Sequence, residues 1–555
     1  MSLLAQPVVA LFASISLGYL IGLLRIGPVQ IGGTCGTLFA ALAIGQLGVT
    51  IDGPLKDMAF ALFIFALGFI AGPQFFANIR SGSRYGIFSL IEVGTVLLLL
   101  VLTILVLKLD PGTIAGLFAG AATESAVLGT ASEAISRLGL SAAATATLHN
   151  NLVSTYAVTY LFGLVGIVVF TSQIAPVLLR INLAQAAQSL AETLGADQKD
   201  ENEEGLPSLV GRAYRAGPLA GHTVGDFEHS RGDTVVIERI QRGEQTLEAE
   251  PDTAIEADDI VLVLGRRSAV VAAQDRLGEE VPPPPGANVP ITTRDIVLSR
   301  KEAFGLSIRE LRKVAGRRMQ RGVFISAISR MGHAIPVLPG TRLEQGDVIT
   351  LYGTDTVIDR AASELGAALP RTDKTDFIML GLGVVVGLAL GSLSVKIGTL
   401  QLTLGTGGGA LLAGIVFGWL HMRHPRRGAL PIPAAEFAKD FGLAAFIACV
   451  GLAAGKDAIR LIMQYGAILP VLGIAMAVTP ALVSLFVGTR LLKIEPPLLL
   501  GAIAGQQCST PAITALVSQS NSAIPVVGYT VTYAISNVLL PLMGPVVVSL
   551  AVALR

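Results

Sequence analysis

Long apolar segments in both halves of the chain constrain its fold more than any other feature. Runs of about 20 residues, the length that crosses a bilayer as a helix, recur before residue 175 and after residue 376. The expected membrane helices cover 5–25, 31–49, 58–79, 86–107 and 147–175, and then 376–394, 403–421, 436–455, 463–489 and 523–552. Each half also holds one interrupted apolar segment, 112–137 and 497–520. The pattern predicts an α-helical polytopic membrane protein.

The composition agrees with a chain that lies mostly in lipid. Hydrophobic residues make up 52% and charged residues 14%, whereas soluble domains carry roughly 25% charge. The formal net charge of zero gives no argument for a nucleic-acid partner. Cys35, Cys449 and Cys508 lie in apolar segments, so neither a disulfide framework nor a metal site is expected. The N-terminus lacks a basic region and an early cleavage site, so a removable signal peptide is not expected either.

The two membrane halves repeat one another. Three blocks match in the same order: "LKDMAFALFIFALGFIAG" (55–72) with "AKDFGLAAFIACVGLAAG" (438–455), "LKLDPGTIAGLFAGAATESA" (107–126) with "LKIEPPLLLGAIAGQQCSTP" (492–511), and "YAVTY" (156–160) with "YTVTY" (529–533). Internal repeats of this kind indicate copies of one structural unit. We therefore expect transmembrane repeat 1 over 1–180 and transmembrane repeat 2 over 371–555.

Two basic loops predict that the repeats are inverted. "NIRSGSRYG" (78–86) follows the third helix of its half, and "HMRHPRRG" (421–428) follows the second helix of its half. Because basic short loops stay in the cytoplasm, equivalent helices run in opposite directions. Inversion requires an odd number of membrane crossings in the first half, which has six apolar segments. The number of crossings is odd if each interrupted segment is a re-entrant hairpin. The chain then has ten crossings, and both termini lie outside. The alternative is an interrupted helix that spans the membrane, together with one miscounted helix.

The residues between the halves have soluble character. An amphipathic helix and an acidic linker are expected over 181–205, and a stiff proline-rich linker at 281–290. Alternation of apolar and polar residues predicts strands at 232–240, 258–265, 321–329 and 346–353. Pro251, Asp259 and Gly265 recur with the same spacing as Pro339, Asp347 and Gly353. We expect two copies of one small cytoplasmic α/β module, over 206–284 and 287–370.

Polar runs interrupt the two broken segments at equivalent positions, "AGAATESA" (119–126) and "AGQQCSTP" (504–511). Non-helical backbone at membrane depth is tolerated where protein buries it or it lines an aqueous cavity. Transporters with inverted repeats bind substrate at such breaks near the midplane, where helix N-terminal dipoles and hydroxyl donors suit a carboxylate. The expected substrate-binding residues are Thr123, Glu124, Ser125, Gln506, Gln507, Cys508, Ser509 and Thr510.

Each of these residues also has a plainer interpretation. Ser, Thr and Gly mediate ordinary helix packing in membranes. Glu124 is the most informative residue, because an intramembrane carboxylate is costly and tends to be functional. It can bind a substrate amino group or a proton, or it can serve as the partner of a buried lysine or hydroxyl cluster. The pairs Lys56–Asp57 and Lys439–Asp440 are expected to be ion pairs at helix ends.

The last helix of each half contributes further candidates for the substrate site. They are Asn150, Asn151, Tyr156 and Tyr533. Each of these tyrosines has a second tyrosine four residues away on the same helix face, Tyr160 for Tyr156 and Tyr529 for Tyr533. Tyrosine is also common at membrane interfaces, so both interpretations stay open.

These features together resemble a known family. The duplicated "AG..TES" and "AG..CSTP" halves, split by two modules, resemble the aspartate–alanine exchanger family of bacterial transporters. The modules resemble the C-terminal subdomain of potassium-conductance regulators (RCK), and "INLAQAAQSLAE" (181–192) is similar to the family's linker. The resemblance implies exchange of small carboxylates, such as L-aspartate for L-alanine, with succinate in some relatives. It also implies a homodimer in the bacterial inner membrane.

Two other function classes were weighed against an exchanger. A cation–proton antiporter or potassium-linked carrier, gated by the RCK-like modules, is the alternative, but the hairpins lack the pair of aspartates that would favour it. An enzyme has little support, because the soluble part has no phosphate loop, no cluster of metal ligands and no GxGxxG motif on a strand–helix turn. No cofactor is expected, and the ligand of the modules, if they bind one, stays open.

Overall fold

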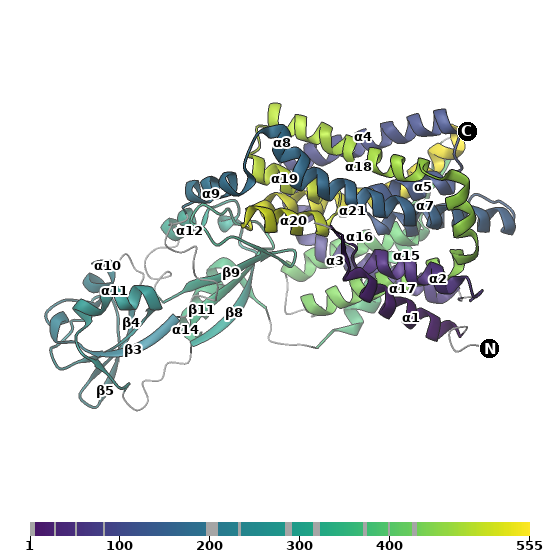
Figure 1. Cartoon of the computed structure of the whole chain (residues 1–555). Helices are drawn as coiled ribbons and strands as arrows, with labels where there is room; N and C mark the ends of the chain where they lie inside the picture. Colours follow the sequence, from purple (N-terminus) through teal and green to yellow (C-terminus); the bar gives the residue numbers. More distant parts are fainter. Residues whose placement is uncertain are drawn as a thin grey trace. The chain divides into compact units, whose positions relative to one another are not determined.

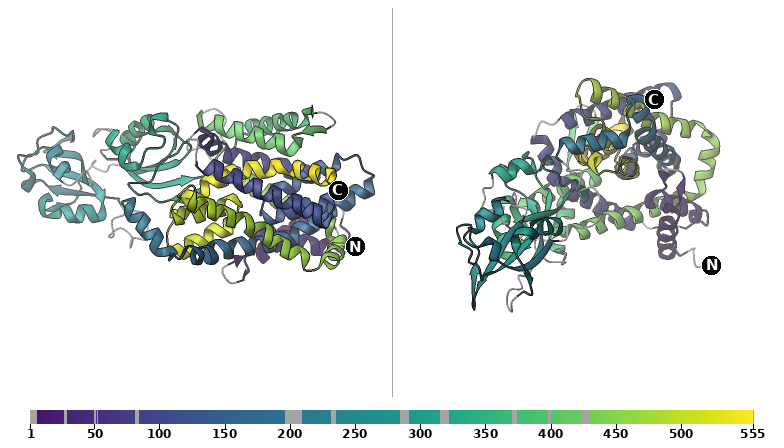
Figure 2. Two further views of the ribbon diagram at one scale, coloured as in Figure 1. Left: turned by 90° about the horizontal axis from the view of Figure 1, so that it is seen from above. Right: turned by 60° about the vertical axis from the view of Figure 1, so that its left-hand side comes forward.

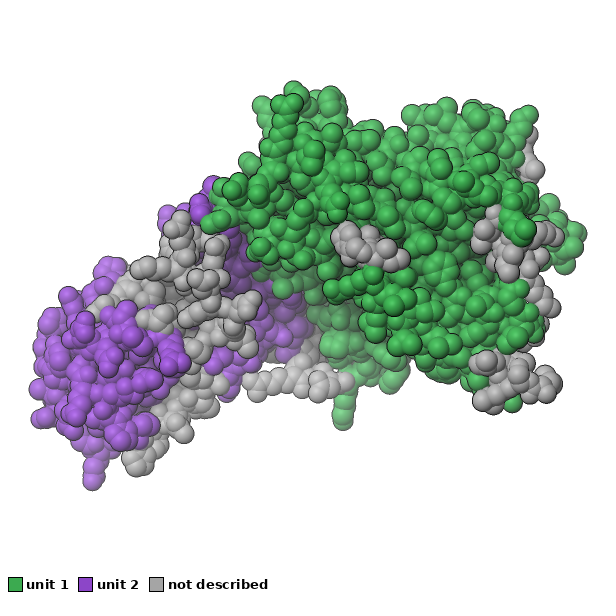
Figure 3. Space-filling view, in the orientation of Figure 1, with its two compact units in different colours: residues 1–190, 330–335, 370–555 green, residues 191–329, 336–369 purple. Residues whose placement is uncertain are grey.

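Helices build the two halves of the chain, and antiparallel sheets build the part between them (Figure 1). The computed structural model describes residues 6–554 except 27–28, 50, 52, 81–83, 196–208, 231–234, 284–290, 315–321, 370–373, 398–399 and 424–429. Contacts divide the chain into unit 1 (1–190, 330–335 and 370–555) and unit 2 (191–329 and 336–369), which Figure 3 colours separately. The acidic linker and parts of the proline-rich linker and of both basic loops lie outside the described residues.

Repeat 1 begins with two helices joined by a small hairpin of strands. Its elements are α1 (Pro7–Gly22), β1 (Arg25–Ile26), β2 (Val29–Gln30), α2 (Gly33–Gly45), α3 (Gly53–Arg80), α4 (Arg84–Leu107), α5 (Pro111–Ala121), α6 (Ser125–Ser136) and α7 (Ala142–Val169). A π-helix, η2 (Phe170–Ile174), continues α7 into α8 (Ala175–Leu179), and α9 (Leu183–Thr193) follows.

Repeat 2 has the same order of elements. It contains α15 (Phe377–Ser392), β13 (Ser394–Ile397), β14 (Leu400–Thr403), α16 (Gly405–Arg423), α17 (Ile432–Tyr465), α18 (Ile468–Arg490), α19 (Pro496–Gln506), α20 (Thr510–Ser520) and α21 (Ile524–Ala553). Among the described residues, each repeat therefore has five helices and one broken helix, in the order that the sequence predicts.

Six of the described helices are long and apolar enough to cross a membrane. These stretches are Gly53–Phe76, Tyr85–Leu107, Ala142–Leu179, Ile432–Gly455, Ile468–Arg490 and Ile524–Ala553. Shorter apolar helices occupy Pro7–Gly22, Gly33–Gly45 and Phe377–Ser392. The chain is a multi-pass membrane protein.

The two repeats interleave instead of forming separate halves (Figure 2). α3 packs along α16, and α17, the equivalent of α3, packs along α2, the equivalent of α16. Glycines make these crossings close: a Cβ added to Gly68 would lie 2.4 Å from the Leu411 carbonyl oxygen, and one added to Gly455 would lie 2.6 Å from the Gly45 carbonyl carbon. Small residues at such crossings are typical of helix packing in membranes.

Each broken helix turns back on itself as a hairpin. Gly112, near the start of α5, faces Leu148 of α7, and Gly120, near its end, faces Tyr156. α6 begins beside Tyr156 and returns to the level of His149. α19 and α20 repeat this arrangement against α21. The hairpin interpretation therefore describes the structure, and the spanning alternative does not.

The central segment of the chain contains two sheets with one topology. The first consists of β3 (Leu209–Arg215), β4 (Val235–Arg242), β5 (Gln245–Glu248), β6 (Ile260–Arg266) and β7 (Glu280–Val281), in the order β5-β4-β6-β3-β7. Its helices are η3 (Gly217–Leu219), α10 (Val224–Ser230) and α11 (Arg267–Leu277). This sheet is the first of the two α/β copies that the sequence predicts.

The second sheet belongs to the following segment of the chain. It consists of β8 (Ile291–Leu298), β9 (Phe324–Arg330), β10 (His333–Ile335), β11 (Val348–Thr354) and β12 (Gly366–Ala368), in the order β10-β9-β11-β8-β12. Its helices are η4 (Lys301–Ala303), α12 (Ile308–Val314) and α14 (Asp355–Leu365). Strand for strand, this order equals that of the first sheet, so the central segment is an internal duplication.

The aspartates that recur in the two copies have the same structural role. Asp259 accepts the Glu256 backbone N–H at 2.8 Å, and Asp347 accepts the Glu344 backbone N–H at 2.8 Å. Burial alone would raise the pKa of Asp259, but hydrogen bonds from the Arg242 guanidinium, at 2.9 and 2.8 Å, help to hold it below its ordinary value. The repeated aspartate thus fixes the turn before a central strand.

Candidate functional site

The two hairpins break at equivalent residues with the same backbone geometry. α5 ends before Thr123, whose φ is 49°, and α19 ends before Cys508, whose φ is also 49°. A positive φ is unusual for a β-branched residue such as threonine, and strained backbone of this kind tends to occur at functional sites. The next residues, Glu124 and Ser509, are the N-caps of α6 and α20. The sequence match between the repeats is therefore a match in conformation.

The tips of the two hairpins contact each other inside unit 1. The Thr123 hydroxyl donates to the Gln507 carbonyl at 2.5 Å, and the Cys508 thiol hydrogen-bonds the Glu124 carboxyl. A tyrosine of the following long helix supports each tip. Tyr156 lies 2.6 Å from the Ser125 hydroxyl, and Tyr529 lies 3.4 Å from the Thr510 hydroxyl. The tips therefore form one polar centre built from both repeats.

A cavity of about 820 Å³ opens beside this centre. Its volume lies in the range of pockets that bind small molecules. Elements from both repeats line it: the tips, α20, the β1–β2 hairpin, the N-terminus of α2, η2, α7, α17 and α21. The polar lining residues include Thr123, Glu124, Ser125, Cys508, Ser509, Thr510, Ser518, Arg25, Gln30, Thr34, Ser172, Gln173, Tyr160, Tyr533, Asn537, Lys439 and Asp440.

Charges of both signs face the cavity. The Arg25 guanidinium is exposed and makes no ion pair with any residue that the structure describes. Lys439 pairs with its neighbour Asp440 at 3.3 Å. Glu124 is 4% exposed, and its carboxylate accepts the Ala126 N–H at 3.0 Å. With the N-terminal ends of α6 and α20 close by, the arrangement can bind a small solute that carries carboxylates and an amino group.

Seven of the predicted substrate-binding residues line this cavity. They are Thr123, Glu124, Ser125, Cys508, Ser509, Thr510 and Tyr533. The expected ion pair of Lys439 with Asp440 is present, but it lies seven residues inside α17 and not at the end of the helix, and both residues also lie on the cavity wall. Sequence reasoning assigned them a role at the helix end but did not place them at the site.

The other predicted residues lie elsewhere. The Gln506 amide donates to the Phe88 carbonyl at 2.8 Å, and the Gln507 amide donates to the Glu92 carboxylate at 2.9 Å, so both glutamines face α4. Asn151 donates to Asp110 at 3.1 Å. Asn150 is not part of the cavity wall, and Tyr156 stands behind Ser125.

Some residues of the site escaped the sequence analysis. Arg25 is an isolated cation between two apolar helices, and this signal was available in the sequence. Ser172 and Gln173 line the cavity from the π-helix η2, and such bulges often occur at functional sites. Glu92 is a single acidic residue within an apolar helix, the same signal that drew attention to Glu124.

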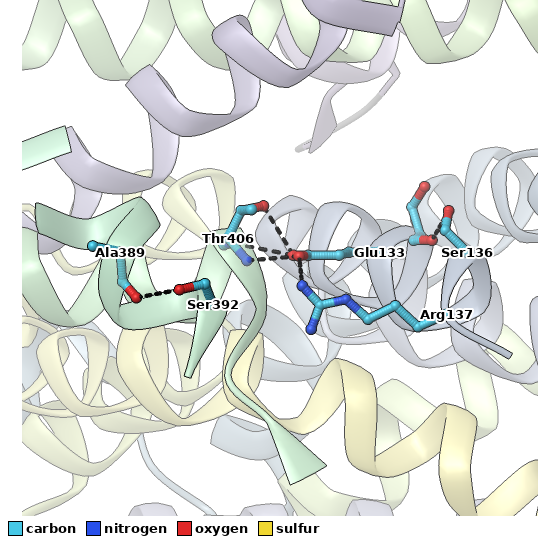
Figure 4. A network of polar contacts seen from close by, with 8 residues as sticks. Glu133, Ser136, Arg137, Ala389, Ser392 and Thr406 are labelled. Carbon is cyan, nitrogen blue, oxygen red and sulfur yellow. Dashed lines mark hydrogen bonds and ion pairs between the residues drawn. The ribbon is translucent and has the colours of Figure 1, made fainter. Parts of the chain in front are cut away.

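Glu133 of α6 contacts the N-terminus of α16 and the neighbouring Arg137 (Figure 4). Its carboxylate accepts the backbone N–H groups of Thr406 at 2.7 Å and Gly407 at 3.3 Å, and the Thr406 hydroxyl at 3.0 Å. Arg137, one turn further along α6, donates to it at 2.5 Å. The glutamate thus caps the N-terminus of α16 and ties hairpin 1 to it.

The equivalent place in the fold, between α20 of repeat 2 and the N-terminus of α2 of repeat 1, is occupied by the cavity. α2 is the equivalent of α16, and a glycine with positive φ stands at the start of both helices, Gly32 at 82° and Gly405 at 73°. The first residues of α2, Gly33 and Thr34, line the cavity. Ser518 of α20 occupies the place of the capping glutamate and also lines the cavity. One side of the centre is therefore latched and the other is open.

A duplicated helical fold with paired hairpin tips at a polar cavity defines a membrane transporter. Comparison with known families agrees. The Asp-Al_Ex family model, described as Predicted Permease Membrane Region, matches residues 10–176 and 379–549. A TrkA-C domain model matches residues 215–278, within the first module. The chain belongs to the Asp-Al_Ex permease family, as the resemblance seen in the sequence implied.

Curated relatives extend over the whole chain. An uncharacterized transporter of Zymomonas mobilis is 37% identical over 550 residues, which cover 98% of this chain and 97% of the relative. One of Bradyrhizobium diazoefficiens is 37% identical over 549 residues, with the same coverage. One of Francisella tularensis is 34% identical over 563 residues and covers 99% and 98%. The relatives therefore share both membrane halves and the central segment.

Proposed function

We propose that the protein is a secondary exchanger of small carboxylates in the bacterial inner membrane. The expected pair is L-aspartate against L-alanine, or a related C4 dicarboxylate such as succinate. The observation that carries the proposal is the cavity at the hairpin tips, in which Arg25 and Glu124 lie with two helix N-termini. Membership of the Asp-Al_Ex family supports it.

In this proposal each end of an amino-acid substrate has its own partner. Arg25 can hold a carboxylate through two parallel hydrogen bonds, the geometry that a guanidinium favours. Glu124 can accept hydrogen bonds from the ammonium group. Hydroxyl groups of Ser509 and Thr510 line the same wall and can donate to further substrate oxygens.

The charges of the cavity also give a reason for exchange rather than net transport. A carrier that closes without substrate would bury the exposed Arg25 guanidinium without a partner in a cavity that the buried Glu124 also lines, and an uncompensated buried charge costs several kcal/mol. A bound substrate supplies the missing partners. Closure is therefore favoured when the cavity is loaded, and the empty carrier stays open until a counter-substrate binds.

Counterflow into proteoliposomes tests this proposal. Vesicles loaded with aspartate, alanine or succinate should take up labelled aspartate, and Arg25→Gln should lower the apparent affinity for every carboxylate about tenfold, because one charge-assisted hydrogen-bond partner is lost. Arg490→Gln, at an exposed arginine at the end of α18, is the matched control. The proposal is wrong if none of the three solutes exchanges while sodium or potassium ions move.

We further propose that residues 206–370 regulate and dimerise the carrier on the cytoplasmic side, with both termini on the opposite side. The two sheets share one topology, and none of their residues lines the cavity. Both observations support a role for this segment that is separate from substrate binding. A ligand of these modules can act only through different affinities for two carrier states. When a flexible linker replaces 206–370, substrate selectivity should persist while rate or oligomeric state changes. Loss of substrate binding in a folded, inserted carrier would contradict this.

A further inference from the structure

A second polar cluster lies behind the tip of hairpin 2, between α4 and α19. Glu92 of α4 is 1% exposed, and the Gln507 amide donates to its Oε1 at 2.9 Å. The Gln506 amide reaches the carbonyl of Phe88, one turn earlier on α4, at 2.8 Å. Ser89, on the same face of α4, is 0% exposed. The cluster is thus separate from the cavity wall.

The cluster lacks hydrogen-bond donors. Ser89 Oγ, Glu92 Oε2, Gln506 Oε1 and Gln507 Oε1 are all buried without a hydrogen-bond partner among the described residues. Three of these atoms can only accept, and the serine hydroxyl is the single donor. An unsatisfied buried acceptor costs about 1–3 kcal/mol. One additional hydrogen on the Glu92 oxygen would turn an acceptor into a donor and satisfy a glutamine oxygen.

No cation balances the Glu92 charge within the part of the chain that the structure describes. Across the tip of hairpin 2, the Cys508 thiol interacts electrostatically with both Glu92 and Glu124. The other helices packed on α4, namely α5, α18 and α21, bring no described acidic or basic side chain to it. An isolated buried carboxylate is far more costly than a neutral acid. The chemistry of the cluster therefore suits a proton.

Packing does not require these polar groups. The helices equivalent to α4 and α19 are α18 of repeat 2 and α5 of repeat 1, which also pack together. Their residues at the matching positions are Ile474 for Ser89, Ala477 for Glu92, and Ala121 and Ala122 for the two glutamines. An apolar interface thus serves the same position in the fold. The interface between α4 and α19 keeps a costly polar version, which points to a function.

The cluster is bonded directly to the substrate site. The Gln507 side chain binds Glu92, while its carbonyl accepts the Thr123 hydroxyl at 2.5 Å. The next residue, Cys508, hydrogen-bonds Glu124. A change in the charge of Glu92 therefore acts on the same backbone break that substrate contacts.

We propose that Glu92 binds a proton that is coupled to substrate exchange, an inference that rests on the proposed function. A proton from water forms an O–H bond with Glu92 Oε2, removes one negative charge and allows donation to a glutamine oxygen. When the proton returns to water, the carboxylate is restored. A proton bound there offsets the extra negative charge when a dicarboxylate or aspartate exchanges for a solute with one fewer negative charge.

Calorimetric titration of the purified wild-type protein with aspartate or succinate tests the inference. In buffers of different ionisation enthalpy, the heat should report net uptake of up to about one proton per substrate, because linkage requires proton uptake where binding favours the protonated acid. Glu92→Gln should bind substrate without proton uptake, and its counterflow should lose the pH dependence of the wild type. Glu495→Gln, at an exposed glutamate before α19, should behave as the wild type.

The outcomes separate this inference from the proposed function. Substrate binding with no proton uptake at any pH of a series through the neutral range, while counterflow persists, overturns the proton site and leaves the exchanger intact. A requirement for sodium without proton uptake does the same. If no carboxylate exchanges, the proposed function fails first. Because the wild-type titration needs no variant, a Glu92→Gln protein that fails to fold does not remove the test.

Discussion

Glu124→Gln is expected to reduce exchange of amino-acid substrates about 100-fold while succinate exchange is largely retained. Glu124 is the carboxylate assigned to the substrate ammonium group, and removing one partner of a buried charge pair costs 2–5 kcal/mol or more. The glutamine oxygen can still accept the Ala126 N–H that caps α6, so the hairpin should stay folded. Succinate has no ammonium group and loses no partner. Competition of unlabelled solutes against labelled aspartate in proteoliposomes measures both effects.

Ser509→Ala is the matched control, because Ser509 is the equivalent N-cap in the other hairpin. Its hydroxyl accepts the Ala512 N–H at 3.4 Å, and loss of such a cap costs about 1 kcal/mol. Its effect should be smaller and equal for substrates with and without an amino group. Equal losses of aspartate and succinate exchange in Glu124→Gln would show that the carboxylate stabilises the hairpin tip and does not bind the substrate ammonium group.

The hairpin tips could be predicted from the sequence because the signal occurs twice. A polar run in one apolar segment has many explanations, but equivalent runs in two aligned repeats have few. The structure shows that Thr123 and Cys508 share a left-handed backbone and that Glu124 and Ser509 share an N-cap. The duplication therefore predicted conformation as well as position.

The direction of neighbouring side chains at the break could not be predicted. Gln506 ends α19 and Gln507 forms its C-cap, so both keep the helical face toward α4. The positive φ of Cys508 then turns the chain, and residues 508–510 face the cavity. A run of five polar residues thus divides between two sites. Only the backbone geometry decides where the division falls.

The residues that line the cavity could not be predicted from the sequence either, because they come from elements that are distant in the chain. Arg25 lies on a two-residue strand, and Ser172 and Gln173 lie on one turn of π-helix, which has no clear sequence signature. Sequence symmetry also predicts two equal sides. The structure has one latched and one open side, and the two sides differ at Glu133, whose equivalent in the other hairpin is Ser518.

Glu133→Ala is expected to open the latched side of the transporter. The substitution removes three hydrogen bonds from α16 to a carboxylate at its N-terminus. Hydrogen bonds to charged groups and favourable charge at a helix end together stabilise the latch by about 3 kcal/mol, or about 100-fold in the open-to-closed ratio. The reaction of Cys508 with a membrane-impermeant thiol reagent, in a background with Cys35→Ala and Cys449→Ala, measures access from each face.

Arg137→Gln separates the latch from its neighbouring ion pair. Arg137 is 40% exposed, and an exposed ion pair contributes about 0–1 kcal/mol, so this variant should change access less than about fivefold. In the wild type, Cys508 should react only from the face on which Gly33 and Thr34 line the cavity. In Glu133→Ala it should also react from the opposite face. Equal effects of the two variants would assign the latch to the salt bridge, and unchanged access in both would show that packing of α6 on α21 keeps that side closed.

Ser518, the equivalent of Glu133, cannot supply a carboxylate to the N-terminus of α2. Closure of the open side therefore requires a carboxylate from the bound substrate, and this requirement is the physical basis for coupling transport to substrate binding.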